Sequence, residues 1–328
     1  MRVALISELG GVPRVGELPE PTLSPGQALV QVEAAALNPV DIAIASGNHY
    51  SRVPTPPYVP GSEGAGVVVR GERLPSGTRV RFEGQGALAE LVAVEEDRCL
   101  EVSLESRLAA AFGIAGSAAW LALHLRAQLA PGERVLVLGA TGVVGQVAVQ
   151  LAHQSGAGRV VAAGRDPGRL RSTRDLGADA TVLLDARTKE ELAAAFIAAA
   201  EGELDVVLDP LWGMPLEAAL LACRTGARVV NVGQSASPVA ELPSRLVRGR
   251  QLTIIGHANP STPWEARRQA LMAVSELLAG GHLRLEVESL PLDDVAEGWR
   301  RLALSSHRKL VVLPAAGRTP TGEAPAEP

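Results

Sequence analysis

Residues 135–145, VLVLGATGVVG, form the part of the sequence whose residue types and spacing most clearly suit a chemical task. The glycines at 139, 142 and 145 follow an apolar run of strand length and open a helical pattern. In this context Gly139 permits a tight turn, Gly142 lets a pyrophosphate approach the backbone, and Gly145 lets the helix pack on the strand. The dinucleotide phosphates are therefore expected at Gly139, Ala140, Thr141, Gly142, Val143 and Val144.

The residues after the next apolar run, 160–163, distinguish NAD from NADP. An NAD site places an acidic residue there to bind the ribose 2′-hydroxyl. Here Gly164 leaves room, Arg165 can hold a 2′-phosphate through two N–H groups, and Arg169 can assist. Asp166 conflicts with this, because a carboxylate turned toward the ribose would favour NAD. We predict NADPH as the cofactor.

The elements that must position these residues alternate between strand and helix from residue 118 onward. Uninterrupted apolar strands followed by helices indicate a parallel sheet covered on both faces. Strands are expected at 135–138, 160–163, 181–184, 205–208, 229–232 and 252–255. Helices are expected at 118–129, 143–155, 168–176, 188–200 (with Thr188 as its cap), 216–223 and 263–278.

The first 112 residues lack this alternation of strand and helix. They contain short apolar runs broken by Gly and Pro, a pattern typical of a β-rich barrel or sandwich. Strands are expected there at 3–7, 28–34, 64–69 and 88–94, and again near the C-terminus at 284–287 and 310–313. The predicted fold class is α/β, with a doubly wound parallel sheet inserted into a β-rich domain. The expected divisions are 1–117, 118–259, a return to the first domain over 260–314, and a disordered tail over 315–328.

Composition excludes several functional classes. The net charge of −5 argues against a nucleic-acid partner, and no apolar run approaches the ~20 residues of a membrane span. Cys99 and Cys223 are too few for a disulfide framework or a multi-cysteine zinc site. A cytoplasmic enzyme with a small-molecule substrate is the class that fits these features.

Six segments in order carry a resemblance to a known family: residues 35–41, 60–68, 116–119, 139–145, 176–179 and 206–210. Over residues 1–314 the chain resembles the zinc-independent quinone oxidoreductases of the medium-chain dehydrogenase/reductase superfamily, the group that includes zeta-crystallin. The resemblance implies a GroES-like catalytic domain with an inserted Rossmann domain, and NADPH in a cleft between them. It also implies hydride transfer to a quinone or an α,β-unsaturated carbonyl, and a homodimer paired through the edge strand at 252–255.

The resemblance also bears on metal binding. The zinc-dependent branch of the superfamily has Cys where this chain has Asn38 and His where it has Ser62, so that only Glu63 matches. Catalytic zinc needs three good protein ligands. We therefore expect no metal.

A metal-free site needs other groups to stabilise charge on the substrate oxygen. Asn38 is the best candidate donor, and Asp41 can order the loop or relay a proton. Quinone oxidoreductases often carry Tyr two residues after that Asp, where this chain has Ala43. Tyr50, on a Pro-rich loop, can supply the missing phenol.

Further cofactor contacts follow from the resemblance and from the strand ends. Ser117 is expected beside the phosphates or the nicotinamide, and Lys309 near the cofactor. Asp209, Gly233 and Gln234 follow expected strands, at the edge where open α/β sheets bind ligands. Two alternatives remain open: an enoyl or other double-bond reductase of a biosynthetic pathway, and a cofactor-binding protein with little turnover.

Overall fold

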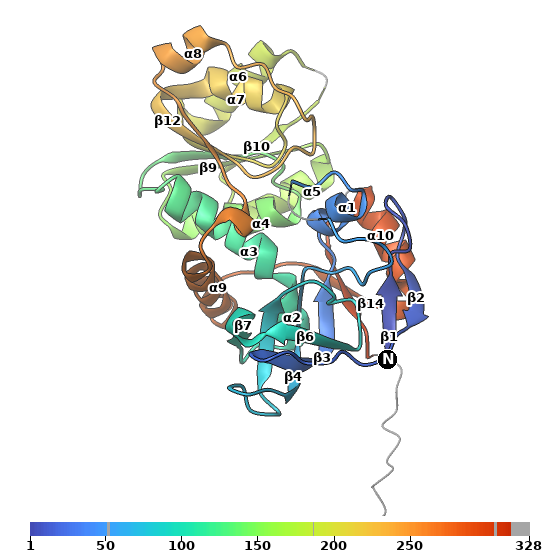
Figure 1. The fold of residues 1–328 in the computed structure, drawn as a ribbon. Coiled ribbons are helices and arrows are strands. Elements are labelled where there is room, and N and C mark those ends of the chain that lie inside the picture. Colours follow the sequence, from blue (N-terminus) through green and yellow to red (C-terminus); the bar gives the residue numbers. More distant parts are fainter. Residues whose placement is uncertain (51–52, 186, 305–306, 316–328) are drawn as a thin grey trace, which may run out of the picture. The chain divides into compact units, whose positions relative to one another are not determined.

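The computed structural model describes residues 1–50, 53–185, 187–304 and 307–315 (Figure 1). The chain divides into two compact units, each described by itself below. Unit 1 comprises Met1–Gly113 together with the chain from Val287 onward, and unit 2 comprises Ile114–Glu286. Of the tail expected to be disordered, residues 316–328 lie outside the described residues.

Unit 1 is built around β3 (Gln27–Ala36), a strand whose alternate residues are buried apolar side chains. It pairs antiparallel with β4, β6 and β15, in a sheet of order β14-β15-β3-β4-β5-β7. The other elements of unit 1 are β1 (Arg2–Leu5), β2 (Arg14–Glu17), α1 (Pro39–Ala45), β4 (Glu63–Arg70), β5 (Arg79–Glu83), β6 (Leu91–Glu95), η1 (Glu96–Arg98), β7 (Cys99–Glu101), α2 (Ser106–Ala111), β14 (Val287–Pro291), η5 (Leu292–Asp294), α10 (Val295–Ala303) and β15 (Lys309–Leu313).

The two ends of the chain meet in this sheet. Val311 and Val312 of β15 lie opposite Ala36 and Ala35 of β3, so the chain does return to its first domain. The returning strand does not lie at 284–287 as expected, because the backbone N–H and C=O of Arg284 are bonded to the Gln150 side chain rather than to a strand. The strand begins at Val287 instead, as β14.

Unit 2 contains a parallel sheet of order β10-β9-β8-β11-β12-β13. The order reverses between β8 and β11, and this reversal is where doubly wound sheets bind ligands. Its elements are α3 (Gly113–Trp120), η2 (Leu121–Arg126), β8 (Arg134–Val137), α4 (Val143–Gln154), β9 (Arg159–Gly164), α5 (Pro167–Ser172), η3 (Thr173–Leu176), β10 (Ala180–Leu183), α6 (Lys189–Ala200), β11 (Leu204–Asp209), α7 (Met214–Ala222), β12 (Cys223–Asn231), α8 (Ser244–Gly249), β13 (Thr253–Gly256), η4 (Asn259–Ser261) and α9 (Trp264–Ala279).

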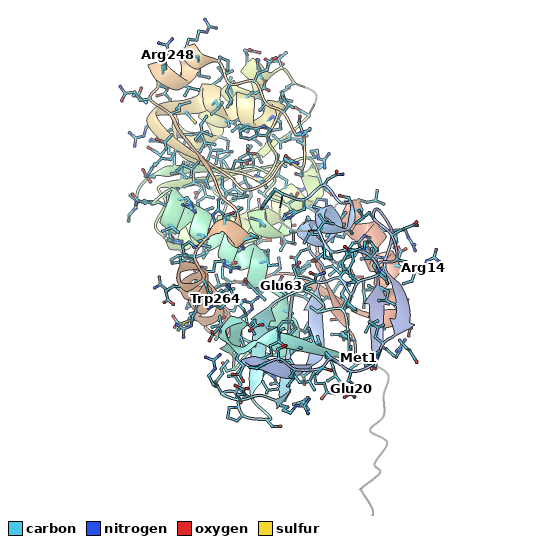
Figure 2. All side chains as sticks on the ribbon, viewed as in Figure 1. Met1, Arg14, Glu20, Glu63, Arg248 and Trp264 are labelled. Carbon is cyan, nitrogen blue, oxygen red and sulfur yellow. The ribbon has the colours of Figure 1, made fainter. Side chains whose placement is uncertain are left out.

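Both faces of this sheet are covered, as the apolar strands predicted. Leu136 and Leu138 belong to the core that includes Phe196 of α6 and Leu220 of α7. Val137 points to the opposite face by strand alternation and is also fully buried. Helix α8 lies further out, with no buried residue, and Arg248 stands on its exposed surface (Figure 2).

Several expected helices have different bounds. The helix expected at 118–129 starts earlier, as α3, and continues as the π-helix η2. The helix expected at 168–176 is α5 followed by a 3₁₀ turn, and the helix expected at 216–223 is α7. The cap at Thr188 is confirmed, since its Oγ1 accepts from the backbone N–H of Glu191 at 3.2 Å.

Helix α9 lies with unit 2 rather than with the return segment expected from residue 260. It packs closely on α3: a Cβ added to Gly116 would lie 2.8 Å from Val274 of α9. The chain therefore returns to unit 1 only at Val287. Among the described residues, no helix combines the length and apolar character needed to cross a bilayer.

Candidate active site

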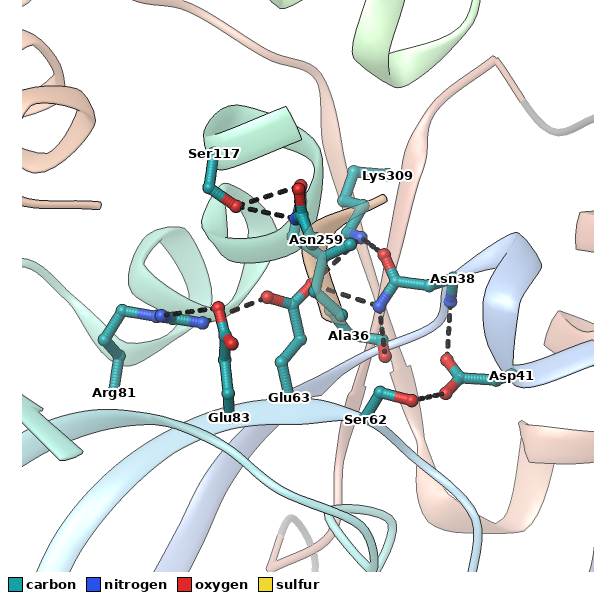
Figure 3. A network of polar contacts seen from close by, with 11 residues as sticks. Ala36, Asn38, Asp41, Ser62, Glu63, Arg81, Glu83, Ser117, Asn259 and Lys309 are labelled. Atoms are coloured by element: carbon teal, nitrogen blue, oxygen red, sulfur yellow. Dashed lines mark hydrogen bonds and ion pairs between the residues drawn. The ribbon is translucent and has the colours of Figure 1, made fainter. Parts of the chain in front are cut away.

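A buried polar cluster lies at the centre of unit 1, where β3, β4 and β15 meet (Figure 3). Lys309 opens β15, Glu63 opens β4, and Asn38 follows β3; all three are at most 3% exposed. The Lys309 Nζ donates to Asn38 Oδ1 at 2.5 Å and to Glu63 Oε1 at 3.4 Å. The Asn38 Nδ2 also donates to Glu63 Oε1, at 3.0 Å. These contacts draw together three chain segments that are distant in sequence.

Glu63 is held between two cations. Its Oε2 accepts from Arg81 at 3.1 Å, while Lys309 lies on the side of Oε1. Arg81 is 1% exposed and also pairs with Glu83 at 3.5 Å. Burial lowers the pKa of Lys309, although the negative charges of Glu63 and Asp41 act in the opposite direction. The Glu63 carboxylate is thus satisfied within the protein.

The Asn38 amide has protein partners at both ends. Besides its bonds to Lys309 and Glu63, its Nδ2 lies 3.4 Å from the Ala36 carbonyl oxygen. Donation to a substrate oxygen, as expected from the sequence, would require one of the Nδ2 bonds to break. In this arrangement Asn38 orients Lys309 and Glu63.

Asp41 is buried beside this cluster, in the first turn of α1. Its Oδ2 accepts from the backbone N–H of Asn38 at 2.8 Å, and this contact orders the turn. Its Oδ1 accepts from Ser62 Oγ at 2.5 Å. Burial raises the pKa of Asp41 to about 6, against the lowering effects of Ser62, Asn38 and Lys309. The carboxyl therefore keeps its proton to a higher pH than an exposed aspartate does.

Neither tyrosine has a hydrogen bond to this cluster in the part of the chain that the structure describes. The expected residue, Tyr50, is 74% exposed, and its ring lies 4.2 Å from that of His49. Tyr58 packs on the core of unit 1, and its enclosed hydroxyl has no hydrogen-bond partner among the described residues. Burial, followed by the charge of Asp41, raises the pKa of Tyr58.

The glycine motif of unit 2, residues 139–145, forms the turn that opens α4, here called the cradle. Gly139 has φ +59°, a value that suits glycine, and Gly142 caps α4. A Cβ on Gly145 would lie 2.4 Å from the Gly139 carbonyl oxygen, so the helix packs directly on the turn. A Cβ on Gly142 would meet only that oxygen, at 3.4 Å, which leaves space beside the backbone. The remaining expected residues, Ala140, Thr141, Val143 and Val144, complete the turn and the first residues of α4.

After the end of β9, the Asp166 carboxylate accepts hydrogen bonds from the backbone of α5. Its Oδ1 accepts from the backbone N–H groups of Gly168 and Arg169 at 2.8 and 3.0 Å, as the cap of α5. Arg165 is exposed, and Arg169 makes only a long, exposed contact of 3.8 Å with Asp166. Gly164 lies next to Thr141 of the cradle, since a Cβ there would be 3.0 Å from the Thr141 methyl group. In this structure the Asp166 carboxylate therefore serves as the cap of α5.

Asp209 lies at the end of β11 and organises the neighbouring loops. Its Oδ1 accepts from the backbone N–H groups of Leu211 and Trp212 at 2.8 and 2.9 Å, and Asn231 donates to its Oδ2 at 2.9 Å. Burial raises its pKa.

Gly233 and Gln234 follow the neighbouring strand, β12. A Cβ on Gly233 would lie 2.9 Å from the Pro210 carbonyl oxygen, and Gln234 is exposed. Of these three expected residues at the strand ends, Gln234 has the most accessible side chain, because Asp209 is fully buried.

In a second polar chain of unit 2, only Ser117 was among the predicted site residues. The Asn259 Nδ2 donates to Ser117 Oγ at 2.9 Å, and its Oδ1 pairs with His257 Nε2 at 2.9 Å (Figure 3 shows the Ser117–Asn259 pair). Arg126 donates to His257 Nδ1 at 3.5 Å. His257 and Asn259 follow β13 directly, at the edge where open α/β sheets bind ligands, and this position could have marked them as site residues in the sequence. Glu63 precedes the apolar residues of β4, and Arg81 lies between Val80 and Phe82 in β5; these positions were the corresponding signals.

Two family models match the chain. The alcohol dehydrogenase GroES-like domain matches residues 24–104, and the zinc-binding dehydrogenase model matches residues 143–276. The quinone oxidoreductase of Lama guanicoe is 32% identical over 321 residues, covering 93% of this chain and 94% of that protein. The chain is a quinone oxidoreductase-like medium-chain dehydrogenase/reductase.

Other members of this superfamily and related modules are also similar. The quinone oxidoreductase of Mus musculus is 31% identical, covering 95% of this chain and 98% of that protein. A pikromycin polyketide synthase component of Streptomyces venezuelae is 32% identical over 90% of this chain, which corresponds to 8% of the synthase. The fold matches that of Escherichia coli quinone oxidoreductase complexed with NADPH, with a TM-score of 0.86 at 20% identity, over 96% of this chain and all of that one.

Proposed function

We propose that this medium-chain dehydrogenase/reductase is an NADPH-dependent, metal-independent reductase that transfers hydride to a quinone or an α,β-unsaturated carbonyl. The observation that carries the cofactor assignment is the site at the end of β9. The Asp166 carboxylate caps α5, and the neighbouring Arg165, which follows Gly164, is exposed. A 2′-phosphate suits this arrangement better than a 2′-hydroxyl. Solved relatives that bind NADPH agree with it.

The cradle of unit 2 has the properties that the phosphates require. Val143 and Val144 are the first two residues of α4, so their N–H groups have no acceptor within the helix, and the positive end of the helix dipole lies there. NADPH bound there would supply the hydride. Arg165, with Arg169, would hold its 2′-phosphate.

The donor set of unit 1 supports a reaction without metal. Glu63 is the only zinc-type ligand retained there, and it is flanked by Arg81 and Lys309. A divalent cation next to two fixed cations would be repelled. In the described part of the chain, no three His, Cys, Asp or Glu side chains gather to hold a metal. Of the donors in this cluster, the half-buried Ser62 hydroxyl is more accessible than the buried Lys309 ammonium, and it would face a reduced substrate oxygen.

The substrate class follows from the relatives. Quinone oxidoreductases match this chain over nearly their whole length, and this favours a quinone or a simple enone. The similarity to part of a polyketide synthase favours the second candidate, an enoyl or other double-bond reductase of a biosynthetic pathway. The sequence departure at Ala43 and the exposed Tyr50 are compatible with either acceptor.

The test is NADPH oxidation by the purified, EDTA-treated protein. The acceptors are 9,10-phenanthrenequinone, 1,4-benzoquinone, 2-cyclohexenone and crotonyl-CoA, each with NADPH and with NADH. We expect turnover with NADPH that survives EDTA, and the better acceptor separates quinone from enone and thioester. Activity lost in EDTA and restored by zinc would refute metal independence. Tight NADPH binding without turnover on any acceptor would indicate a cofactor-binding protein instead.

We also propose a cytoplasmic homodimer, formed through the outer edge of β13. This strand is one end of the unit 2 sheet, with Thr253 and Gly256 exposed. An edge strand presents unpaired N–H and C=O groups that a second copy can pair with.

A further inference from the structure

The contacts of the Asp41 carboxyl group determine which of its two oxygens carries the proton when Asp41 is neutral. The two oxygens of its bond with Ser62, Ser62 Oγ and Asp41 Oδ1, lie 2.5 Å apart. The other carboxylate oxygen, Oδ2, accepts the Asn38 backbone N–H at 2.8 Å. When Asp41 is neutral, its proton therefore belongs on Oδ1, from which it donates to Ser62 Oγ.

A neutral Asp41 changes what Ser62 can do. A serine hydroxyl has a single hydrogen. While Asp41 is ionised, that hydrogen is used in the bond to Oδ1; once Asp41 donates, the Ser62 hydrogen is free for another acceptor. Asp41 is 2% exposed and Ser62 is half-buried, so Ser62 is the member of the pair that a ligand can reach.

The surroundings of Asp41 keep the neutral form available. Lys309 on β15 favours the carboxylate, whereas Glu63 on β4 opposes it, and Tyr58 also interacts with its charge. Burial dominates these influences and raises the pKa of Asp41 to about 6. A general acid works best when its pKa lies near the working pH.

We propose that Ser62 is a catalytic residue that protonates the reduced substrate oxygen, and that Asp41 supplies its proton. This inference rests on the proposed reductase function. Ser62 stands where the zinc-dependent branch of the superfamily has a zinc-binding His. In this inference Ser62 transfers the proton, and Asp41 is the group that supplies it to Ser62.

The proton and electron balance is simple. Hydride addition to the β-carbon of an enone shifts the C=C electron pair, leaving the negative charge on the carbonyl oxygen. The Ser62 O–H bond breaks as that oxygen takes the proton, and Ser62 Oγ takes the proton from Asp41 Oδ1. Water then reprotonates the Asp41 carboxylate. Overall the substrate gains one hydride, from NADPH, and one proton.

The kinetic test compares Ser62→Ala with Ser62→Thr and with Ser46→Ala. Ser46 is a control in the same unit: its exposed hydroxyl donates to the Ala43 carbonyl oxygen at 2.8 Å and accepts the Asn48 backbone N–H at 3.4 Å. With 2-cyclohexenone we expect Ser62→Ala to lower kcat about 100-fold with little change in the KM for NADPH. The wild-type kcat should fall as pH rises through the pKa of Asp41, near 6, and this fall should vanish in Ser62→Ala. Ser62→Thr should restore most of the rate, and Ser46→Ala should match wild type.

A second readout, the pH dependence of unfolding, does not depend on turnover. The Asp41 pKa of about 6 in the folded protein exceeds the ordinary value of 3.8, so the folded state binds the extra proton. The stability of the wild type relative to Asp41→Asn should be greatest below pH 4 and decrease as pH rises to about 6. A difference that increases with pH would overturn the inference, as would an active wild type whose kcat and pH profile survive Ser62→Ala. A wild type that turns over no acceptor would instead refute the proposed function, and the inference with it.

Discussion

At the scale of single residues, cofactor choice depends on what the Asp166 carboxylate binds. A free carboxylate at the end of β9 would pair with the 2′-hydroxyl of NADH and repel the 2′-phosphate of NADPH. Here two backbone N–H groups of α5 hold it. Under the proposed assignment, the exposed Arg165 side chain is the charge that would meet the 2′-phosphate.

Replacing Arg165 with Ala should raise the KM for NADPH about 10–100-fold and leave the KM for NADH nearly unchanged. One or two charge-assisted hydrogen bonds, each worth about 1.5–3 kcal/mol, would be lost only with the phosphorylated cofactor. Steady-state kinetics with both cofactors measure this. Arg248→Ala, on the exposed surface of α8, is the matched control and should change neither value. Equal effects on NADPH and NADH would show that Arg165 does not recognise the phosphate.

At the scale of elements, the entry into α4 depends on a contact between helix and turn that only glycine permits. Gly145 faces the Gly139 carbonyl oxygen and the Ala140 Cα, which a Cβ would approach to 2.4 and 2.6 Å. These are backbone atoms, so neither can turn aside as a side chain would. The helix N-terminus would have to move away from the turn that forms the cradle.

Gly145→Ala should therefore destabilise unit 2 by about 1–3 kcal/mol, as overpacking does, and weaken NADPH binding at least about tenfold. Urea denaturation and cofactor fluorescence titration measure the two effects. Gly249→Ala at the end of α8 is the control, because no atom lies within 4 Å of the added Cβ. If Gly145→Ala binds NADPH as well as wild type does, the cradle does not hold the cofactor phosphates.

At the scale of the whole molecule, the unit 2 sheet has two ends, β10 and β13. The proposed dimer uses β13, so a charge placed there would meet its own copy across a two-fold axis and repel it. The same charge on β10 would not meet its copy.

Thr253→Lys on β13 should raise the dimer dissociation constant at least about tenfold, since like charges juxtaposed at an interface cost several kcal/mol. Sedimentation velocity at several concentrations measures the change. Thr181→Lys on β10 is the matched control and should leave the dimer intact. Dissociation by Thr181→Lys alone would place the interface at the other edge, and a monomeric wild type would refute the dimer.

The sequence alone determined the parallel sheet of unit 2 and its glycine-spaced turn. Apolar strands, a glycine-spaced turn and a capped helix such as the one starting after Thr188 are local patterns, and a few neighbouring residues specify them. The return of the chain to unit 1 was expected from the short strands after the helix at 263–278, and the family resemblance implies it as well. The strand expected at 284–287 was misplaced because the Gln150 side chain bonds the Arg284 backbone, and the strand begins at Val287 instead.

Only the tertiary structure decided how the polar side chains are used. Lys309 and Asn38 are separated by most of the chain, and strand pairing between β15 and β3 brings them together. The sequence also does not show which hydrogen-bond partner a polar side chain has in the folded protein. Arg81 donates to Glu63, and Ser62 donates to Asp41. A side chain's chemistry depends on burial and on these partners, because together they set its charge and decide which hydrogen bonds remain free.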